Sequence, residues 1–338
     1  MYTLLISFVV LAAFNIGLLV YAFEQAAGQI KIVWKAKPVE KFINNPEFPD
    51  SLKQKLLLIQ EVREFAVDSL GINDSENYTK LYNQKGKPAI LVLTACKPYS
   101  FEPVEWNFPI LGKFSYKGFF NFERAKQEHD KWKSEGYDTE LSPVTAWSTL
   151  GWFKDPILTG MLRRSTGELA ELIIHELTHA TLYVKSSVDY NENLATFVGE
   201  EGAKIFLRHK FGENSPEYRE YIHILEDEIT FGKHILSGYE RLDSLYKSFG
   251  ESTPVAVKDS LKKQMINEIV SGIDNIGLHI PGNYGRIRSG DYVPNNTFFM
   301  SYVRYRAEQN TFQKEFAERF DSNFKKYLSY LKETYPSL

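Results

Sequence analysis

The chain has 338 residues, of which 43% are hydrophobic and 25% are charged, which is enough for a buried core in one large domain or two modest ones. The net charge is −3 and no long basic block is present, so we expect no nucleic acid as a partner. Cys96 is the only cysteine, which excludes an intrachain disulfide.

The first 23 residues contain no charged side chain. A stretch of this length can span a bilayer as a helix. It can also be a cleaved signal peptide, but a charged n-region is missing and the apolar stretch is long for that class. We therefore expect residues 1–23 to form a transmembrane anchor that attaches the chain to a membrane, with a signal segment as the alternative.

The remaining residues, 24–338, are expected to form one domain in which helices predominate. In chain order, we expect a helical part over about 29–70, with a loop at 44–51, and then a turn-rich stretch over 71–87. A strand at 89–96 and a short strand near 114–116 should follow, and after them a helix over 122–135 and a strand within 139–148. From Ser215 onward the pattern is helical to about residue 335. These patterns predict the α+β class, with the sheet within about 88–160.

The most informative pattern is an HExxH motif, which runs from His175 through Glu176 to His179. Residues four apart on a helix lie one turn apart on the same face, so both imidazoles can bind one Zn²⁺. The intervening glutamate can then act as a base on water. Ser165 and Glu168 form a capping box that predicts the start of this helix. The metal-binding helices should cover about 166–210.

A catalytic zinc ion needs a third protein ligand. A second helix is expected after the polar turn at 185–189, and a short turn makes the two helices antiparallel neighbours. A carboxylate near the start of the second helix would then face the histidines. Glu192 is the preferred ligand; Glu200 and Glu201 are the alternatives, and Asp189 is a weaker one.

His-Glu-Leu-Thr-His followed by Asn191-Glu192 and Ala195 resembles the gluzincin metallopeptidases, in which the second glutamate is the third zinc ligand. The spacing between the two motifs is shorter than in the large gluzincin families and would suit Glu200 better. A broader resemblance is to a bacterial family of predicted zinc aminopeptidases. It is carried by the following stretches: 105–112, 116–120, 135–138, 146–156, the block from the HExxH motif to Glu201, and 295–299 with Tyr305.

The resemblance implies a zincin-like fold with a small sheet beside the HExxH helix. It also implies that Trp147, Gly151 and Trp152 bind the substrate backbone, and that the paired asparagines before a tyrosine belong to the site. Asn296 is then a substrate-binding residue and Tyr305 the donor that stabilises the oxyanion, with Tyr302 as the alternative. A packing role for the two tryptophans is about as well supported.

Together, these features predict a zinc-dependent peptidase that holds one Zn²⁺ per chain and acts on peptide substrates, preferably as an aminopeptidase on short peptides. The alternatives are an endopeptidase, or a zincin-fold protein that binds metal or peptide without turnover. The resemblance places the catalytic domain on the periplasmic or outer side of the membrane. The lysines after the anchor favour the cytoplasmic side.

Overall fold

The computed structural model describes residues 16–108, 112–144, 154–185, 187–304 and 309–335. The described helices are α2 (Ile16–Lys35), α3 (Glu40–Ile43), α4 (Asp50–Phe65), α5 (Phe122–Ser134), α6 (Thr166–Thr181), α7 (Val188–Phe211), α8 (Pro216–Lys247), α9 (Val255–Gly272), α10 (Gly285–Arg288), α11 (Asn296–Arg304), α12 (Gln309–Phe320) and α13 (Phe324–Thr334). The strands are β1 (Lys37–Pro38), β2 (Lys80–Tyr82), β3 (Leu91–Cys96), β4 (Trp106–Phe108), β5 (Gly112–Phe114), β6 (Lys117–Phe119), β7 (Asp138–Pro143) and β8 (Ile157–Leu158). The described chain is therefore predominantly helical with small sheets, as the α+β prediction requires.

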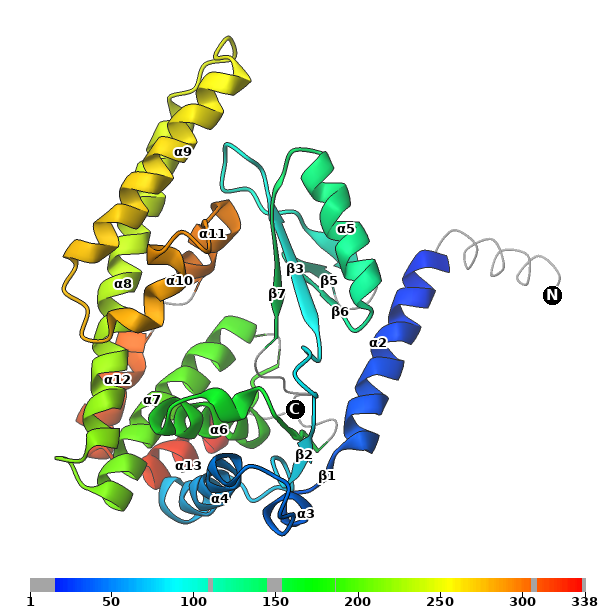
Figure 1. Cartoon of the computed structure of the whole chain (residues 1–338). Helices are drawn as coiled ribbons and strands as arrows, with labels where there is room; N and C mark the ends of the chain where they lie inside the picture. Colours follow the sequence, from blue (N-terminus) through cyan, green and yellow to red (C-terminus); the bar gives the residue numbers. More distant parts are fainter. Residues whose placement is uncertain (1–15, 109–111, 145–153, 186, 305–308, 336–338) are drawn as a thin grey trace.

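The long helices and the β6-β3-β7 sheet occupy different regions of the molecule (Figure 1). The long helices α8 and α9 lie side by side on one flank, and the β6-β3-β7 sheet with α5 lies across from them. Helices α6 and α7 lie below and between these two parts, against α4 and α13. The largest buried apolar cluster surrounds α6 and α7, and separate clusters fill the α8–α9–α11 region and the β3 sheet.

Three small sheets are present in the described residues. Strand β3 is the centre of an antiparallel sheet with β6 and β7 on either side. Strand β2 pairs antiparallel with β1 and parallel with β8, and β4 pairs with β5. Strand β8 is followed by a 3₁₀ turn at Met161–Arg163 and then by α6, so the β1-β2-β8 sheet fixes the entry to the HExxH helix. The β2–β8 pairing was not expected from sequence.

The HExxH helix forms as predicted. Ser165 Oγ accepts a hydrogen bond from the Glu168 backbone N–H, and the Glu168 carboxylate accepts one from the Ser165 N–H, which completes the capping box. Leu169, Ile173 and Leu177 are buried, because they form the apolar stripe of the helix. The predictions of α5, β3 and the start of α8 at Ser215 are confirmed as well.

The prediction of a membrane anchor over 1–23 is wrong. Over the described part of the chain, no helix has both the length and the apolar character that crossing a bilayer requires. Helix α2 begins at Ile16 and carries Glu24, Lys31 and Lys35, so the uncharged stretch does not continue through it. This finding overturns three expectations from the sequence, namely the transmembrane segment, the membrane as a partner and the location at a membrane. Residues 1–15 lie outside the described residues.

Helix α2 packs against the sheet region. Tyr21 stacks on Phe108, with ring centroids 5.6 Å apart, and its hydroxyl donates to the Gly118 carbonyl oxygen at 2.8 Å. Glu24 forms an ion pair with Arg124, the N–O distance being 3.2 Å. The apolar character of this segment is thus partly explained by contacts within the chain.

Candidate active site

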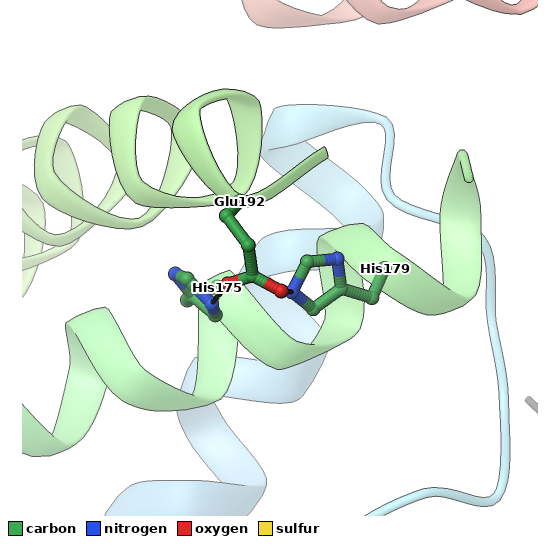
Figure 2. A group of neighbouring side chains, drawn as sticks. All are labelled: His175, His179 and Glu192. Carbon is green, nitrogen blue, oxygen red and sulfur yellow. Dashed lines mark ion pairs between the residues drawn. The ribbon is translucent and has the colours of Figure 1, made fainter. Parts of the chain in front are cut away.

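The structure brings together one atom each from His175, His179 and Glu192, all within 4.8 Å of one another. Figure 2 shows both imidazoles rising from α6 and the carboxylate of Glu192 reaching between them from α7. Glu192 Oε2 lies 3.5 Å from His175 Nε2, and Glu192 Oε1 lies 3.4 Å from His179 Nε2. Two histidines and a carboxylate therefore converge on one point.

These separations suit a tetrahedral metal ion. Bonds of about 2.0–2.1 Å to nitrogen and oxygen place tetrahedral ligand atoms about 3.3–3.4 Å apart. The two observed N–O distances, one to each oxygen of the Glu192 carboxylate, are close to that spacing, and one atom from each of the three side chains lies within 4.8 Å of the others. Two imidazoles with one carboxylate are a ligand set that zinc uses in catalytic sites. The residues present thus fit the metal that the HExxH motif implies.

A close helix crossing holds the ligands in place. Gly199 of α7 faces α6, and a Cβ there would lie 3.1 Å from both the Glu171 carbonyl oxygen and His175 Cβ. A larger residue would push the helices apart. Asn191 orders the turn between the helices, because its side chain donates to the Val184 carbonyl and accepts from the Val184 N–H, both at 2.8 Å. The asparagine of the Asn-Glu pair thus positions the glutamate that follows it.

Charges within the ligand group act on Glu192. Burial alone would raise the pKa of its carboxyl group, but the hydrogen bonds and electrostatic attraction of the His175 and His179 imidazoles hold that pKa well below its ordinary value. The carboxylate is therefore ionised, as a metal ligand must be. His179 Nδ1 is buried and has no hydrogen-bond partner among the described residues.

Glu176 is 8% exposed, and its Oε2 atom is buried with no hydrogen-bond partner in the described part of the chain. Burial raises the pKa of Glu176, against the opposing charge of His175 and His179. A carboxyl group with a raised pKa takes up a proton more readily than an exposed one, which suits a general base.

Tyr78 lies beside Glu176, a neighbour that the sequence analysis missed. Burial raises the pKa of the Tyr78 hydroxyl well above its ordinary value, and the charges of Glu176 and Asp155 raise it further. Its backbone has a φ of 60°, in the left-handed region, and its N–H donates to the Asp155 carbonyl at 2.7 Å. A bulky residue in this conformation is strained, and such strain is concentrated at functional sites. No local motif marks Tyr78 in the sequence.

Tyr183 is a second tyrosine at the site. Its ring packs edge-on against that of His179, with centroids 6.1 Å apart. Burial raises the pKa of Tyr183, and the charge of Glu192 adds to this. Tyr183 follows Leu182, the extended residue that ends α6, so its closeness to the HExxH motif in the chain was the signal that could have identified it.

A cavity of about 850 Å³ opens beside His175, within the size range of small-molecule sites. Its walls come from α6 and α7 on one side and from α8, α11 and the segment around Tyr284 on the other. Four of its lining residues are acidic, namely Glu168, Glu171, Glu200 and Glu228, and Lys204 is its basic lining residue. Burial raises the pKa of Glu171 to about 8, and the charges of Glu228 and Glu200 contribute.

The other predicted site residues lie in different places. Asn296 is fully buried, where its side chain donates to the carbonyl oxygens of Lys97 and Pro98 and accepts from the Tyr246 hydroxyl. It joins α11 to the loop after β3 and is not brought to the histidines. Glu201 pairs with Lys204 at 2.6 Å. The following predicted residues lie outside the described part of the chain: Trp147, Gly151, Trp152 and Tyr305.

Residues 20–335 match the family model described as Putative aminopeptidase. The chain belongs to this family, which indicates a peptidase. No curated protein and no solved structure matches the chain.

Proposed function

We propose that the protein is a zinc-dependent peptidase of the zincin type, with His175, His179 and Glu192 as the metal ligands. The observation that carries the proposal is the convergence of these three side chains at N–O distances of 3.4 and 3.5 Å, next to the buried Glu176. Zinc bound there supplies Lewis acidity, which lowers the pKa of a water molecule to about 7 and polarises a carbonyl group.

Glu176 acts as the general base. Its buried carboxylate takes the proton of the attacking water as the new C–O bond forms, and then passes that proton to the nitrogen of the leaving amine as the C–N bond breaks. The raised pKa of Glu176 supports both steps, because the group must first accept a proton and then release it to an amine.

A hydrogen-bond donor is needed for the carbonyl oxygen, where negative charge develops. Tyr305 remains the candidate from the family resemblance. Tyr183 is a candidate from the geometry, because its ring contacts His179 and its hydroxyl is influenced by the charge of Glu192. Replacing each by phenylalanine in turn identifies the donor, since its removal lowers kcat by about 10²–10³.

We infer that the enzyme removes residues from the amino terminus of short peptides. The carboxylates of the cavity lining other than the protonated Glu171 support this, because their negative charge suits the positively charged α-amine of a peptide better than an uncharged internal segment. The volume of about 850 Å³ suits a few residues rather than a folded protein.

Glu176→Gln provides the test. The variant keeps its metal, because the metal ligands are untouched, but loses at least about 10² of its kcat. Zinc content by elemental analysis and peptide hydrolysis by mass spectrometry measure the two effects. Glu201→Gln, which also replaces a glutamate of α7 but one that stands outside the ligand group and pairs with Lys204, is the matched control and keeps both properties. Full hydrolysis by Glu176→Gln would refute the proposal.

N-acetylated peptides test the second part. An aminopeptidase cleaves the free peptide and not its acetylated form, because acetylation removes the charge that the acidic lining recognises. Equal cleavage of both forms, at internal bonds, would show an endopeptidase in which the zinc site still operates.

A further inference from the structure

A second group of histidines and a carboxylate lies apart from the site described above. His223 and Glu226 follow one another on α8 at a spacing of three residues, so they lie on the same face of the helix. His279 comes from the segment after α9. One atom from each of these side chains lies within 4.8 Å of the others, and His279 Nε2 is 3.1 Å from Glu226 Oε2. Their sequence spacing gives no sign of this, since the group forms only when the chain folds back.

The backbone of His279 is held in place from beneath. Asp227 is 1% exposed, and its two carboxylate oxygens accept hydrogen bonds from the N–H groups of His279 and Ile280, each at 2.7 Å. A buried carboxylate with both oxygens used in this way fixes the segment against α8. The side chains of His279 and Glu226 remain 47% and 54% exposed, so an ion can reach them.

The two imidazole rings lie parallel, with centroids 4.3 Å apart and planes at 6°. Nitrogen lone pairs lie in the plane of each ring, so parallel rings cannot both direct a lone pair at one ion. Binding therefore requires one ring to turn. His279, whose side chain is half exposed, has the room to do so, whereas His223 is half-buried on α8.

We propose that His223, Glu226 and His279 form a second metal site, which binds a divalent transition-metal cation of the zinc class. Two imidazoles and one carboxylate suit Zn²⁺ or Ni²⁺ and are poor ligands for Ca²⁺ or Mg²⁺, which prefer all-oxygen sites. The site depends on no feature of the HExxH site.

An ion at this position would join α8 to the segment that forms part of the cavity wall. Asn283 and Tyr284 line the cavity beside His175, and the Tyr284 ring stacks on Phe231 of α8 with centroids 4.2 Å apart. His279 lies shortly before these residues, so a bond from the ion to its imidazole restrains the whole segment. The expected role is structural support of the cavity wall.

The experiment measures zinc binding by the metal-stripped full chain, using equilibrium dialysis and elemental analysis. Wild type binds zinc in two equivalents, one for each ligand group. The variant His223→Ala/His279→Ala loses one equivalent and keeps the other, which the HExxH group binds. The variant His175→Ala/His179→Ala loses activity and retains the equivalent on α8, and its Tm rises when zinc is added because the bound ion stabilises the folded state.

His129→Ala is the matched control, because His129 is paired only with its neighbour Asp130 among the contacts of the described residues and stands in neither group. It keeps both equivalents. If the variant His223→Ala/His279→Ala does not fold, Glu226→Gln replaces it and weakens the second equivalent by at least about tenfold. Unchanged stoichiometry and affinity in these variants would overturn the proposal, as would a site that takes Ca²⁺ and rejects zinc.

Discussion

His179 and Glu192 belong to consecutive helices, and their Nε2 and Oε1 atoms lie 3.4 Å apart. Neither side chain needs a long loop to reach the other, because the turn between α6 and α7 is short and is tied by Asn191. The proposed metal site is therefore built almost entirely from two helices in direct contact. This relationship leads to predictions about metal binding, helix packing and stability.

Replacing Glu192 by alanine should remove one of three ligands and weaken zinc binding by more than the tenfold to hundredfold expected for loss of a supporting hydrogen bond. Zinc content after dialysis against a weak chelator measures the loss. Glu200→Ala is the informative comparison, since Glu200 lines the cavity and is the alternative ligand. Loss of zinc from Glu200→Ala alone would assign the third ligand to Glu200 instead.

Gly199→Ala should disturb the site through the backbone. The added Cβ would meet His175 Cβ and the Glu171 carbonyl at 3.1 Å, so α7 must shift by a few tenths of an ångström. We expect a destabilisation of about 1–3 kcal/mol, as for overpacking elsewhere, together with weaker zinc binding. Urea unfolding and metal titration measure these effects. Gly17→Ala has open space around its Cβ and should be neutral or slightly stabilising.

Two tyrosine-to-phenylalanine substitutions should have different effects on stability. The Tyr78 hydroxyl is buried beside Glu176 without a well-formed hydrogen bond to it, so its removal should leave the stability unchanged or raise it by up to about 1 kcal/mol. The Tyr221 hydroxyl donates to Glu171 Oε2 at 2.9 Å, and its removal should destabilise the fold by about 1–2 kcal/mol. Urea unfolding measures the free energy of unfolding of Tyr78→Phe and of Tyr221→Phe, each relative to the wild type. A loss of stability in Tyr78→Phe equal to that in Tyr221→Phe would contradict the assignment.

Stability should fall as pH rises across the neutral range because of Glu171. Its pKa is raised from 4.5 to about 8, mainly by burial, so between these values the folded chain holds a proton that the unfolded chain has lost. The free energy of unfolding therefore decreases with pH over this window and levels off above about pH 8. Glu171→Gln should remove this decrease, since glutamine does not titrate and can still accept from Tyr221. Urea unfolding of the wild type and of Glu171→Gln at several pH values measures how the free energy of unfolding depends on pH. The same dependence in both proteins would rule out the assignment.

Local sequence signals were sufficient for the elements that carry the proposed site. The Ser165–Glu168 capping box and the apolar stripe specify α6, and the four-residue spacing of the histidines puts both on one face. The pairing of Asn191 with Glu192 indicated where α7 would supply a carboxylate. These features depend on neighbours within a few turns, which is the range over which sequence patterns are informative.

Features made by distant segments were not accessible in the same way. Tyr78 reaches Glu176 from a separate turn, and Glu228 reaches Glu171 from α8, and neither contact leaves a periodic trace. His223 and His279 are likewise far apart in the sequence and come together only in the fold. The membrane anchor was predicted from the absence of charge in 1–23, but the described helix continues into charged residues and packs on the sheet.

The close approach at Gly199 also determines which part of the molecule can adapt to its substrate. With two helical backbones in van der Waals contact at His175, the edge that holds the three ligands cannot widen without losing their spacing. The facing edge belongs to α8, α11 and the residues around Tyr284. Any change of shape that accommodates a bulkier peptide must therefore come from that second edge, while the edge formed by α6 and α7 stays fixed.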